Sequence, residues 1–331
     1  MVILERFVAI DNVCAWPNLT KMTDGSVVAS IYNQPVHGRW EGDVECWASD
    51  GNCRLWKLRG TAAIHEPTCN RMNVAAGLAA NGDLIVIASG WTNAGKPGTV
   101  NEWKNKEIIP PLVCRSKDGG KTWERKEGVK LLEGKTPYVI PFGDIIKLSS
   151  GELGVCIYSW DPPQKEQNSR FYVSRDDGYT WEYKGLIGEN INETAPLVLP
   201  DGEILAAART MGDQHLELFC SRDNGVTWTN LMPLTLGNQH PAHMLLLKNG
   251  KILLTYGIRN KGLYGIGGRI SADMGRSWES PFVLADFQIA FDGGYPSSVE
   301  CEDGCIATAC YASGIPFHQR YHMGVVRWRI D

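Results

Sequence analysis

The sequence repeats one short pattern six times, and this repeat limits the chain to a small number of folds. Each copy places an Asp, Asn or Ser followed by Gly inside an apolar run, as in "TDGSVVASIY" and "DGEILAAAR". The six turn glycines are Gly25, Gly82, Gly151, Gly202, Gly250 and Gly304. Repeats with the spacing of these six glycines are typical of propellers and other arrays of small structural units. The chain is therefore expected to contain six similar units.

A second repeat has the pattern Ser-x-Asp-x-Gly-x-Thr/Ser-Trp, which we call the Asp box. Its four copies begin at Ser116, Ser174, Ser221 and Ser271, and a degenerate copy, "SDGNCRLW", begins at Ser49. The Asp can accept hydrogen bonds from turn N–H groups, the Gly permits positive φ, and the Trp can fill the space between units. We expect the boxes to be scaffold; calcium binding is the alternative.

Each unit is expected to contain four short strands, with the Asp-Gly turn between the first two and the box between the last two. This pattern predicts an all-β fold, a six-bladed β-propeller formed by residues 1–331 as one domain. The last unit ends at "MGVVRWRI" without a box. The N-terminal run "VILERFVAI" can supply its missing outer strand, so that the N- and C-terminal strands close the ring.

Charge and hydrophobic pattern exclude several classes of partner. The net charge of −4 and the pI near 6.0 provide no basic surface for nucleic acid. No apolar run is long enough for a signal peptide or a membrane span. We expect a cytoplasmic protein with no membrane partner; secretion after removal of a leader is the alternative. The ten cysteines lack paired CxxC elements, which favours free thiols over disulfides.

Strand alternation predicts which residues surround the central axis on the face opposite the boxes. The first-strand positions are Trp16, Asn73, Phe142, Glu193, Pro241 and Tyr295, with Asp144 and His240 adjacent. The second-strand ends are Tyr32, Ser89, Tyr158, Arg209, Gly257 and Tyr311. This rim is polar and aromatic, and its side chains should enter a funnel at the axis. His240 and His243 in "HPAH" are the metal-ligating types closest together, but their spacing in a strand is weak for zinc, so we predict no metal and no cofactor.

Tyr295 and Glu193 form the most informative pair on this rim. They occupy the same position in two different units, so both side chains should enter the funnel. A phenol with a pKa of about 10 is a poor nucleophile at neutral pH, but a carboxylate within hydrogen-bond reach can take its proton during attack. The alternative is a pair that only stabilises the packing.

The boxes on a six-unit repeat resemble those of the sialidase-like propellers, over nearly the whole chain. The stretch "NETAPLVLPDGEILAAAR" is similar to one in sialidases, in which a Glu precedes an apolar strand, an Asp-Gly turn and a strand that ends in Arg. The resemblance implies that Tyr295 is the nucleophile, Glu193 its partner and Arg209 one of three arginines that hold a substrate carboxylate. A neutral phenol approaches such a substrate without the repulsion that a carboxylate nucleophile would meet.

The chain departs from sialidases at the first arginine. Where sialidases have Phe-Arg-Ile-Pro, this sequence has "CAWPNL", which places Ala15 at the arginine position. A different sugar or a rearranged clamp is therefore expected, with Arg39 and Arg259 as candidate substitutes.

The resemblance also implies a general acid in the loop "NQPVHGRWEGDVE". His37, Glu41 and Asp43 are the three candidates in it, and their spacing does not separate them. Trp40, Trp91 and Trp103 are candidates for stacking on a sugar ring or for covering the ends of the blades.

These observations favour an exo-acting glycoside hydrolase of the sialidase-like superfamily that removes a terminal acidic sugar. One alternative is a polysaccharide lyase that uses Tyr295 and a histidine such as His240 on uronic-acid glycans. The other is a glycan-binding propeller without catalysis, which the missing arginine at Ala15 would explain.

Overall fold

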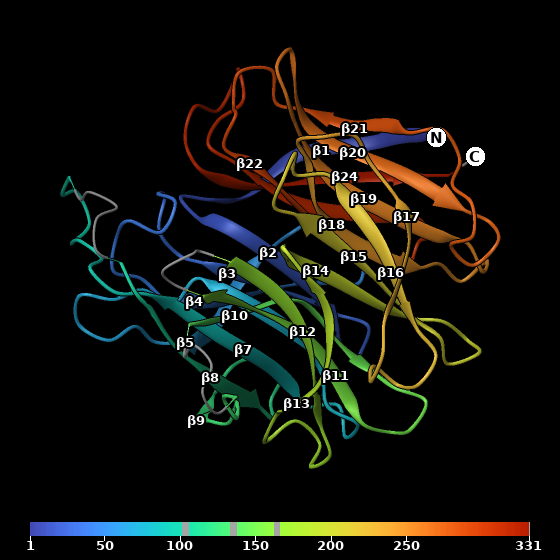
Figure 1. Cartoon of the computed structure of the whole chain (residues 1–331). Coiled ribbons are helices and arrows are strands. Elements are labelled where there is room, and N and C mark those ends of the chain that lie inside the picture. Colours follow the sequence, from blue (N-terminus) through green and yellow to red (C-terminus); the bar gives the residue numbers. More distant parts are fainter. Residues whose placement is uncertain (101–105, 133–137, 162–165, 331) are drawn as a thin grey trace.

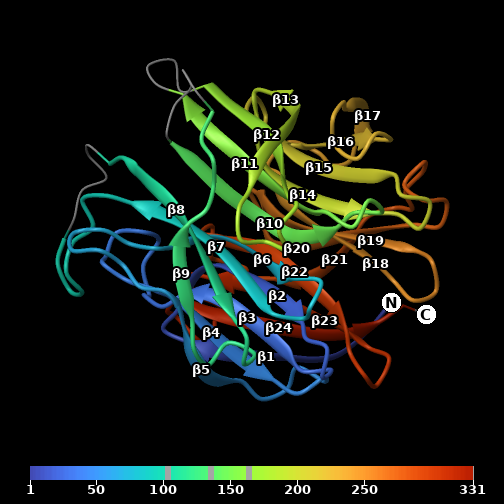
Figure 2. The same ribbon diagram turned by 90° about the horizontal axis from the view of Figure 1, so that it is seen from below.

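The structure is a computed structural model that describes residues 1–100, 106–132, 138–161 and 166–330, and the elements in these residues are β-strands. Antiparallel meanders follow one another in chain order around the molecule (Figures 1 and 2). The predicted all-β propeller is confirmed. No helix among the described residues is long and apolar enough to span a membrane.

Four sheets contain four strands each. The first consists of β2 (Cys14–Lys21), β3 (Val27–Tyr32), β4 (Val44–Ser49) and β5 (Lys57–Ala63). The second consists of β14 (Ile191–Val198), β15 (Ile204–Thr210), β16 (Leu216–Ser221) and β17 (Thr229–Pro233). The third consists of β18 (Gln239–Leu246), β19 (Ile252–Asn260), β20 (Leu263–Ser271) and β21 (Phe282–Asp286). The fourth consists of β22 (Gly293–Glu300), β23 (Ile306–Ala312), β24 (His322–Arg329) and β1 (Val2–Asp11).

The remaining eight strands form one continuous sheet. One half consists of β6 (Asn73–Leu78), β7 (Leu84–Trp91), β8 (Ile108–Ser116) and β9 (Glu124–Glu127). The other half consists of β10 (Val139–Lys147), β11 (Leu153–Asp161), β12 (Glu166–Ser174) and β13 (Glu182–Glu189). The two inner strands, β6 and β10, pair in parallel at the junction of the halves.

The prediction of six separate blades was therefore wrong: the described residues form four separate four-stranded blades and one eight-stranded sheet. The cause lies in the small residues of β6. Ala75 and Ala76 pair with Gly143 and Asp144, and a Cβ on Gly77 would lie 2.5 Å from the carbonyl oxygen of Ile145. Small side chains let the two inner strands approach closely enough for backbone pairing.

The N-terminal strand closes the ring, as the sequence predicts. β1 pairs antiparallel with β24 from Val2↔Arg329 to Asp11↔His322, which makes β1 the outer strand of the last sheet. The two chain ends consequently lie side by side (Figures 1 and 2).

The Asp boxes form compact turns. In the first complete box, the Asp118 carboxylate accepts hydrogen bonds from the Ser116 hydroxyl (2.8 Å) and from the Thr122 backbone N–H (2.9 Å) and hydroxyl (2.6 Å). The indole N–H of Trp123 donates to the carbonyl of Gly120 (3.0 Å). These carboxylate contacts recur in the other three boxes, which accounts for the motif as scaffold.

Candidate active site

Tyr295 and Glu193 meet at the inner ends of β22 and β14. The Tyr295 hydroxyl donates a hydrogen bond to Glu193 Oε1, and the two residues are only 5% and 3% exposed. Each is the third residue of its strand. The structure thus places the phenol and the carboxylate in direct contact although 102 positions separate them in the sequence.

A β-bulge lies at this point of both strands. The pairing of β22 with β23 shifts between Gly294 and Ser297, and the pairing of β14 with β15 shifts between Ile191 and Thr194. Within its bulge, Tyr295 has a left-handed backbone with φ of +51°. Bulges redirect side chains and are frequent beside active sites, so these two turn the phenol and the carboxylate toward each other.

Two arginines flank the pair. Arg209 on β15 donates from Nη1 to Glu193 Oε2 at 2.7 Å, so the carboxylate is bonded through both of its oxygens. Arg259 on β19 lies with Cζ 5.5 Å from the centre of the Tyr295 ring, and its Nη2 donates to the carbonyl of Gly293 at 3.0 Å. The arrangement offers two guanidinium groups beside one buried phenol.

The electrostatic environment keeps Tyr295 protonated. Burial raises the pKa of the phenol well above its ordinary value, the neighbouring Glu193 charge raises it further, and Arg259 and Arg209 only partly oppose this. Burial lowers the pKa of Arg209, but the charge of Glu193, the hydrogen bond to it and the neighbouring phenols together outweigh burial and raise the pKa above its ordinary value. The phenol can therefore react only if a base accepts its proton, and Glu193 is in place to do so.

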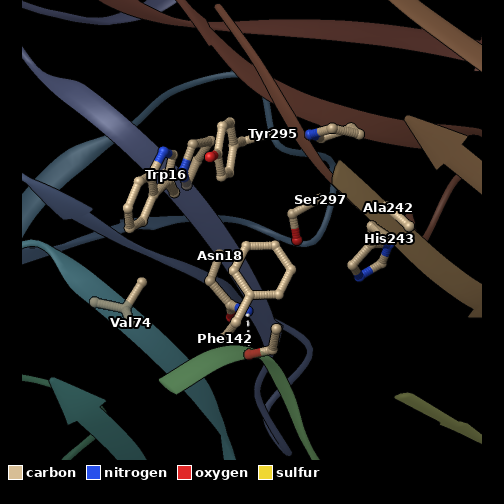
Figure 3. Close-up of a pocket in the computed structure, with 11 residues that line it drawn as sticks. Trp16, Asn18, Val74, Phe142, Ala242, His243, Tyr295 and Ser297 are labelled. Atoms are coloured by element: carbon tan, nitrogen blue, oxygen red, sulfur yellow. Dashed lines mark hydrogen bonds between the residues drawn. The ribbon is translucent and has the colours of Figure 1, made fainter. Parts of the chain in front are cut away.

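Aromatic rings surround the phenol. The Trp16 ring stacks on Tyr295 with centroids 4.8 Å apart and an interplanar angle of 16° (Figure 3). Phe142 and Tyr311 contact the same ring at 6.1 and 5.7 Å between centroids. Tyr158 is buried close by: burial raises the pKa of its phenol, and the neighbouring Glu193 charge raises it further.

A small cavity of about 20 Å³ is lined by Tyr295, Phe142 and Ser297, among others (Figure 3). Such a volume holds about one water molecule. Asn18 and His243 line it, and both bond to Asp144: the Asn18 amide donates at 2.9 Å and His243 Nε2 lies at 3.1 Å. This polar network of Asn18, Asp144 and His243 lies beside the candidate site.

Several buried polar atoms around the site have no hydrogen-bond partner among the described residues. They are Trp16 Nε1, Asn73 Oδ1, Asn192 Oδ1, Arg209 Nε and both ring nitrogens of His240. Buried polar groups are normally bonded to protein or water, so a cluster of unpaired ones indicates a place for a polar ligand or ordered water. Burial, together with the charges of Arg209 and Arg259, lowers the pKa of His240 to about 2, which leaves this imidazole neutral.

A second group of side chains, which we call the Asp292 cluster, adjoins the first. Asp292 accepts hydrogen bonds from the hydroxyls of Tyr311 (2.7 Å) and Tyr321, and lies 3.1 Å from His37 Nδ1. Although burial alone would raise the pKa of Asp292, the contacts with His37, Tyr321 and Tyr311 hold it well below its ordinary value. An open pocket of about 430 Å³ is lined here by Val36, His37, Arg39, Asp292 and Tyr321.

The structure separates the three general-acid candidates. Asp43 accepts a hydrogen bond from the His65 backbone N–H at 2.8 Å and lies 2.6 Å from its Nδ1, and Glu41 accepts one from the Thr68 N–H. His37, by contrast, contacts Asp292 and lies edge-on to Trp16, with ring centroids 6.0 Å apart. The Trp16 ring therefore contacts both His37 and Tyr295.

Sequence reasoning missed Asp292 and Tyr321. Asp292 stands three residues before Tyr295, which is a usable signal, but Tyr321 lies at the end of a loop whose path the sequence does not show.

The stacking candidates make other contacts. Trp40 donates to the Thr99 carbonyl at 3.0 Å, and Trp91 packs edge-on against Trp160. Trp103 lies outside the described residues.

Comparison with solved structures shows the same fold. A protein of unknown function from Dyadobacter fermentans is similar with a TM-score of 0.84, 22% identity and 99% of both chains covered. An intramolecular trans-sialidase from Ruminococcus gnavus, in complex with oseltamivir carboxylate, has a TM-score of 0.74 and 13% identity, with 100% of this chain and 98% of that chain covered. A Hadza microbial sialidase has a TM-score of 0.72 and 17% identity. The match covers 95% of this chain and 65% of the Hadza sialidase.

No curated protein matches the sequence. The profile of the BNR repeat-like domain matches residues 41–308, which is most of the chain and includes the boxes, Glu193, Arg209 and Tyr295. The chain therefore belongs to the BNR repeat-like domain family and has the sialidase-like propeller fold.

Proposed function

We propose that the protein is an exo-acting glycoside hydrolase that removes a terminal acidic sugar through a covalent intermediate on Tyr295. The observation that carries the proposal is the hydrogen bond from the Tyr295 hydroxyl to Glu193, whose second oxygen is bound by Arg209. A buried phenol bonded to a fixed carboxylate is the arrangement that nucleophilic attack by tyrosine requires. Tyrosine nucleophiles are also the known exception, in sialidases, to glycoside hydrolysis by two carboxyl groups.

In the first step, Tyr295 Oη attacks the anomeric carbon and Glu193 accepts the phenol proton. The glycosidic C–O bond breaks, and the leaving oxygen takes a proton from His37. In the second step, water attacks the anomeric carbon and gives a proton to His37. The bond to Tyr295 then breaks and Glu193 returns the proton to the phenol, so that both steps balance.

We assign proton donation to His37, with Asp292 holding its ring through Nδ1. Histidine titrates near neutral pH without a special environment, whereas Asp43 and Glu41 are bonded to neighbouring backbone. The adjoining 430 Å³ pocket provides space for the leaving group.

Arg209 and Arg259 are proposed to bind the carboxylate of the sugar. They approach Tyr295 from two different strands, and guanidinium groups pair favourably with carboxylates. Ala15, at the position where sialidases have their first arginine, is buried next to Trp16 in the aromatic cluster. We infer that the clamp has two arginines here, and Arg39 provides a further cation in the lining of the open pocket.

Initial rates on 4-nitrophenyl glycosides of sialic acid, hexuronic acids and neutral sugars test this function. We expect turnover of at least one acidic glycoside, and Tyr295→Phe should lower its kcat by at least about 10³-fold, because the nucleophilic oxygen is lost. Tyr179→Phe, an exposed tyrosine in an Asp box, is the matched control and should keep wild-type rates. A folded Tyr295→Phe variant that keeps most of the activity refutes the assignment.

The products of the same reactions distinguish the alternatives. Hydrolysis releases a saturated sugar, whereas a lyase would give an unsaturated product that absorbs in the ultraviolet. The structure offers less to a lyase, because the partner of Tyr295 is Glu193 and no hydrogen bond joins His240 to it among the described residues. Binding of acidic sugars without turnover would instead identify a glycan-binding propeller.

A further inference from the structure

Three thiols and a carboxylate meet where the first and last sheets adjoin. Sγ of Cys301, Sγ of Cys305 and a carboxylate oxygen of Asp303 all lie within 4.8 Å of one another. Cys53, from the turn between β4 and β5, packs in the same buried cluster of side chains as Cys301 and Cys305. All three cysteines are free and fully buried. We call these four residues the seam cluster.

The turn that carries Cys301 and Cys305 does not itself need thiols. In this turn, the Cys301 N–H donates to the Cys305 carbonyl at 2.8 Å. The same bond closes the five equivalent turns, between Met22 and Ser26, Ala79 and Asp83, Leu148 and Glu152, Leu199 and Glu203, and Leu247 and Lys251. These other pairs form the same turn without cysteine, so the turn does not depend on the thiols.

Cys53 stands at an unusual position for a side chain. It occupies the place of the box glycine in the degenerate first box, and it has a left-handed backbone with φ of +57°. The four complete boxes have Gly120, Gly178, Gly225 and Gly275 there, with φ between +84° and +97°. Residues with a β-carbon seldom adopt this conformation, which glycine adopts freely. Cys53 thus places a thiol side chain where the four complete boxes have glycine.

The surroundings of the cluster are fixed and suited to negative charge. The Glu302 N–H donates to the Gly51 carbonyl at 3.0 Å, which docks the two turns together. The fully buried Arg327 on β24 donates to Asp303 and, at 3.1 Å, to Cys305 Sγ. A guanidinium group in this position stabilises thiolate and carboxylate charge and orients both ligands, as outer-shell partners of metal sites do.

We propose that Cys53, Cys301, Asp303 and Cys305 bind one Zn²⁺ ion. Thiolates with a single oxygen donor suit zinc, which prefers four ligands in structural sites. Binding would release the three thiol protons and replace the contacts between sulfurs with bonds to one metal. The ion would fasten the turn between β4 and β5 to the turn between β22 and β23, and so tie the first sheet to the last. This proposal does not depend on the glycosidase activity.

The test measures zinc in the full chain, purified under reducing conditions from zinc-supplemented medium. We expect one zinc per chain by mass spectrometry of the metal, and Co²⁺ in its place should give the sulfur-to-cobalt charge-transfer bands of a tetrahedral thiolate site. Cys301→Ser and Cys53→Gly should each weaken zinc binding by at least about tenfold. Cys53→Gly restores the residue that the other boxes have, so it is expected to fold. Cys310→Ser, which removes a buried thiol of β23 outside the cluster, is the control and should bind zinc normally.

Two results would overturn the proposal. One is a reduced wild-type protein that takes up neither zinc nor cobalt, or zinc occupancy that is unchanged in both Cys301→Ser and Cys53→Gly. The other is a disulfide between Cys53 and Cys301 in the protein as isolated, found by mass spectrometry of peptides, which would replace the metal with a covalent bond at the same seam.

Discussion

Tyr295 and Glu193 touch because each is redirected by a bulge in its strand. The pairing of the inner strand with its neighbour also shifts between Cys14 and Asn18 in the first sheet and between Gln239 and Ala242 in the third, whereas β6 and β7 pair without a shift. The bulge thus recurs in several inner strands, and in β22 and β14 it brings a phenol and a carboxylate into contact.

The role of His37 can be tested by the choice of leaving group. In His37→Gln, hydrolysis of alkyl glycosides is expected to fall by about 10²–10⁴-fold, because a poor leaving group needs a proton from a general acid. The same variant should lose far less activity on 4-nitrophenyl glycosides, whose leaving group departs without a proton.

His65→Gln is the matched control for this experiment. His65 is another partly buried histidine paired with a carboxylate, Asp43, but it lies outside the Asp292 cluster. The His65→Gln variant should hydrolyse both classes of substrate at the wild-type rate. Equal losses on alkyl and nitrophenyl glycosides in His37→Gln would show that His37 does not donate the proton.

The sequence could place Tyr295 and Glu193 on one rim because the repeat fixes equivalent positions. It could not separate His37 from Glu41 and Asp43, since all three lie in one loop and their partners come from elsewhere. Asp292 contacts His37 from a position 255 residues away. The other two candidates, Asp43 and Glu41, accept hydrogen bonds from the backbone of His65 and Thr68. Contacts of this kind depend on the path of the loops, for which a single sequence gives no pattern.

At the scale of the element, each Asp box acts as a hydrogen-bonded clamp between the last two strands of a sheet. In the third box, the Asp223 carboxylate accepts hydrogen bonds from the Ser221 hydroxyl and from the backbone and hydroxyl of Thr227. Burial raises the pKa of Asp223, but the hydrogen bonds together lower it more, so the net pKa lies below its ordinary value.

Asp223→Ala should lower the free energy of unfolding by about 1 kcal/mol at neutral pH, the order expected for lost hydrogen bonds at an exposed turn. Because the pKa of Asp223 is lower in the folded state, its contribution is present above the unfolded pKa of about 4 and is lost as the pH falls through the folded value. The difference between variant and wild type in urea unfolding should therefore shrink in acid. Val226→Ala, at an exposed variable position of the same box, should change little; a difference that stays constant with pH would contradict this account.

The boxes and turns were predictable because their chemistry is local. The pairing of β6 with β10 was not, because it depends on how closely two inner strands approach at the axis. The small residues Ala75, Ala76 and Gly77 permit this approach, but small residues alone do not indicate a partner strand.

At the scale of the whole molecule, the ring is held by a strand from the opposite end of the chain. β1 covers the edge of β24, and Arg6 also reaches the Leu284 carbonyl of the neighbouring sheet at 3.0 Å. The sequence predicted this closure from the absence of a box in the last unit. An uncovered β24 would expose a row of unpaired backbone groups, which is a template for association with other chains.

Removal of residues 1–11 is therefore expected to cause self-association and a lower unfolding temperature, because β24 becomes an open edge. Size-exclusion chromatography with light scattering compares this truncated chain with one that lacks only Met1. The shorter truncation should behave like wild type. A truncated chain of the same size and stability as wild type would show that β1 does not secure the ring.

The central claim, a covalent bond to Tyr295 during turnover, is tested most directly by trapping. The protein is incubated with a glycosyl fluoride of its preferred acidic sugar that carries a second fluorine beside the anomeric carbon, which slows the release of an intermediate, and the peptides are then analysed by mass spectrometry. The account predicts one added sugar on the peptide that contains Tyr295, and none in Tyr295→Phe. A sugar attached to any other residue, or turnover of this compound with inversion and no adduct, would contradict it.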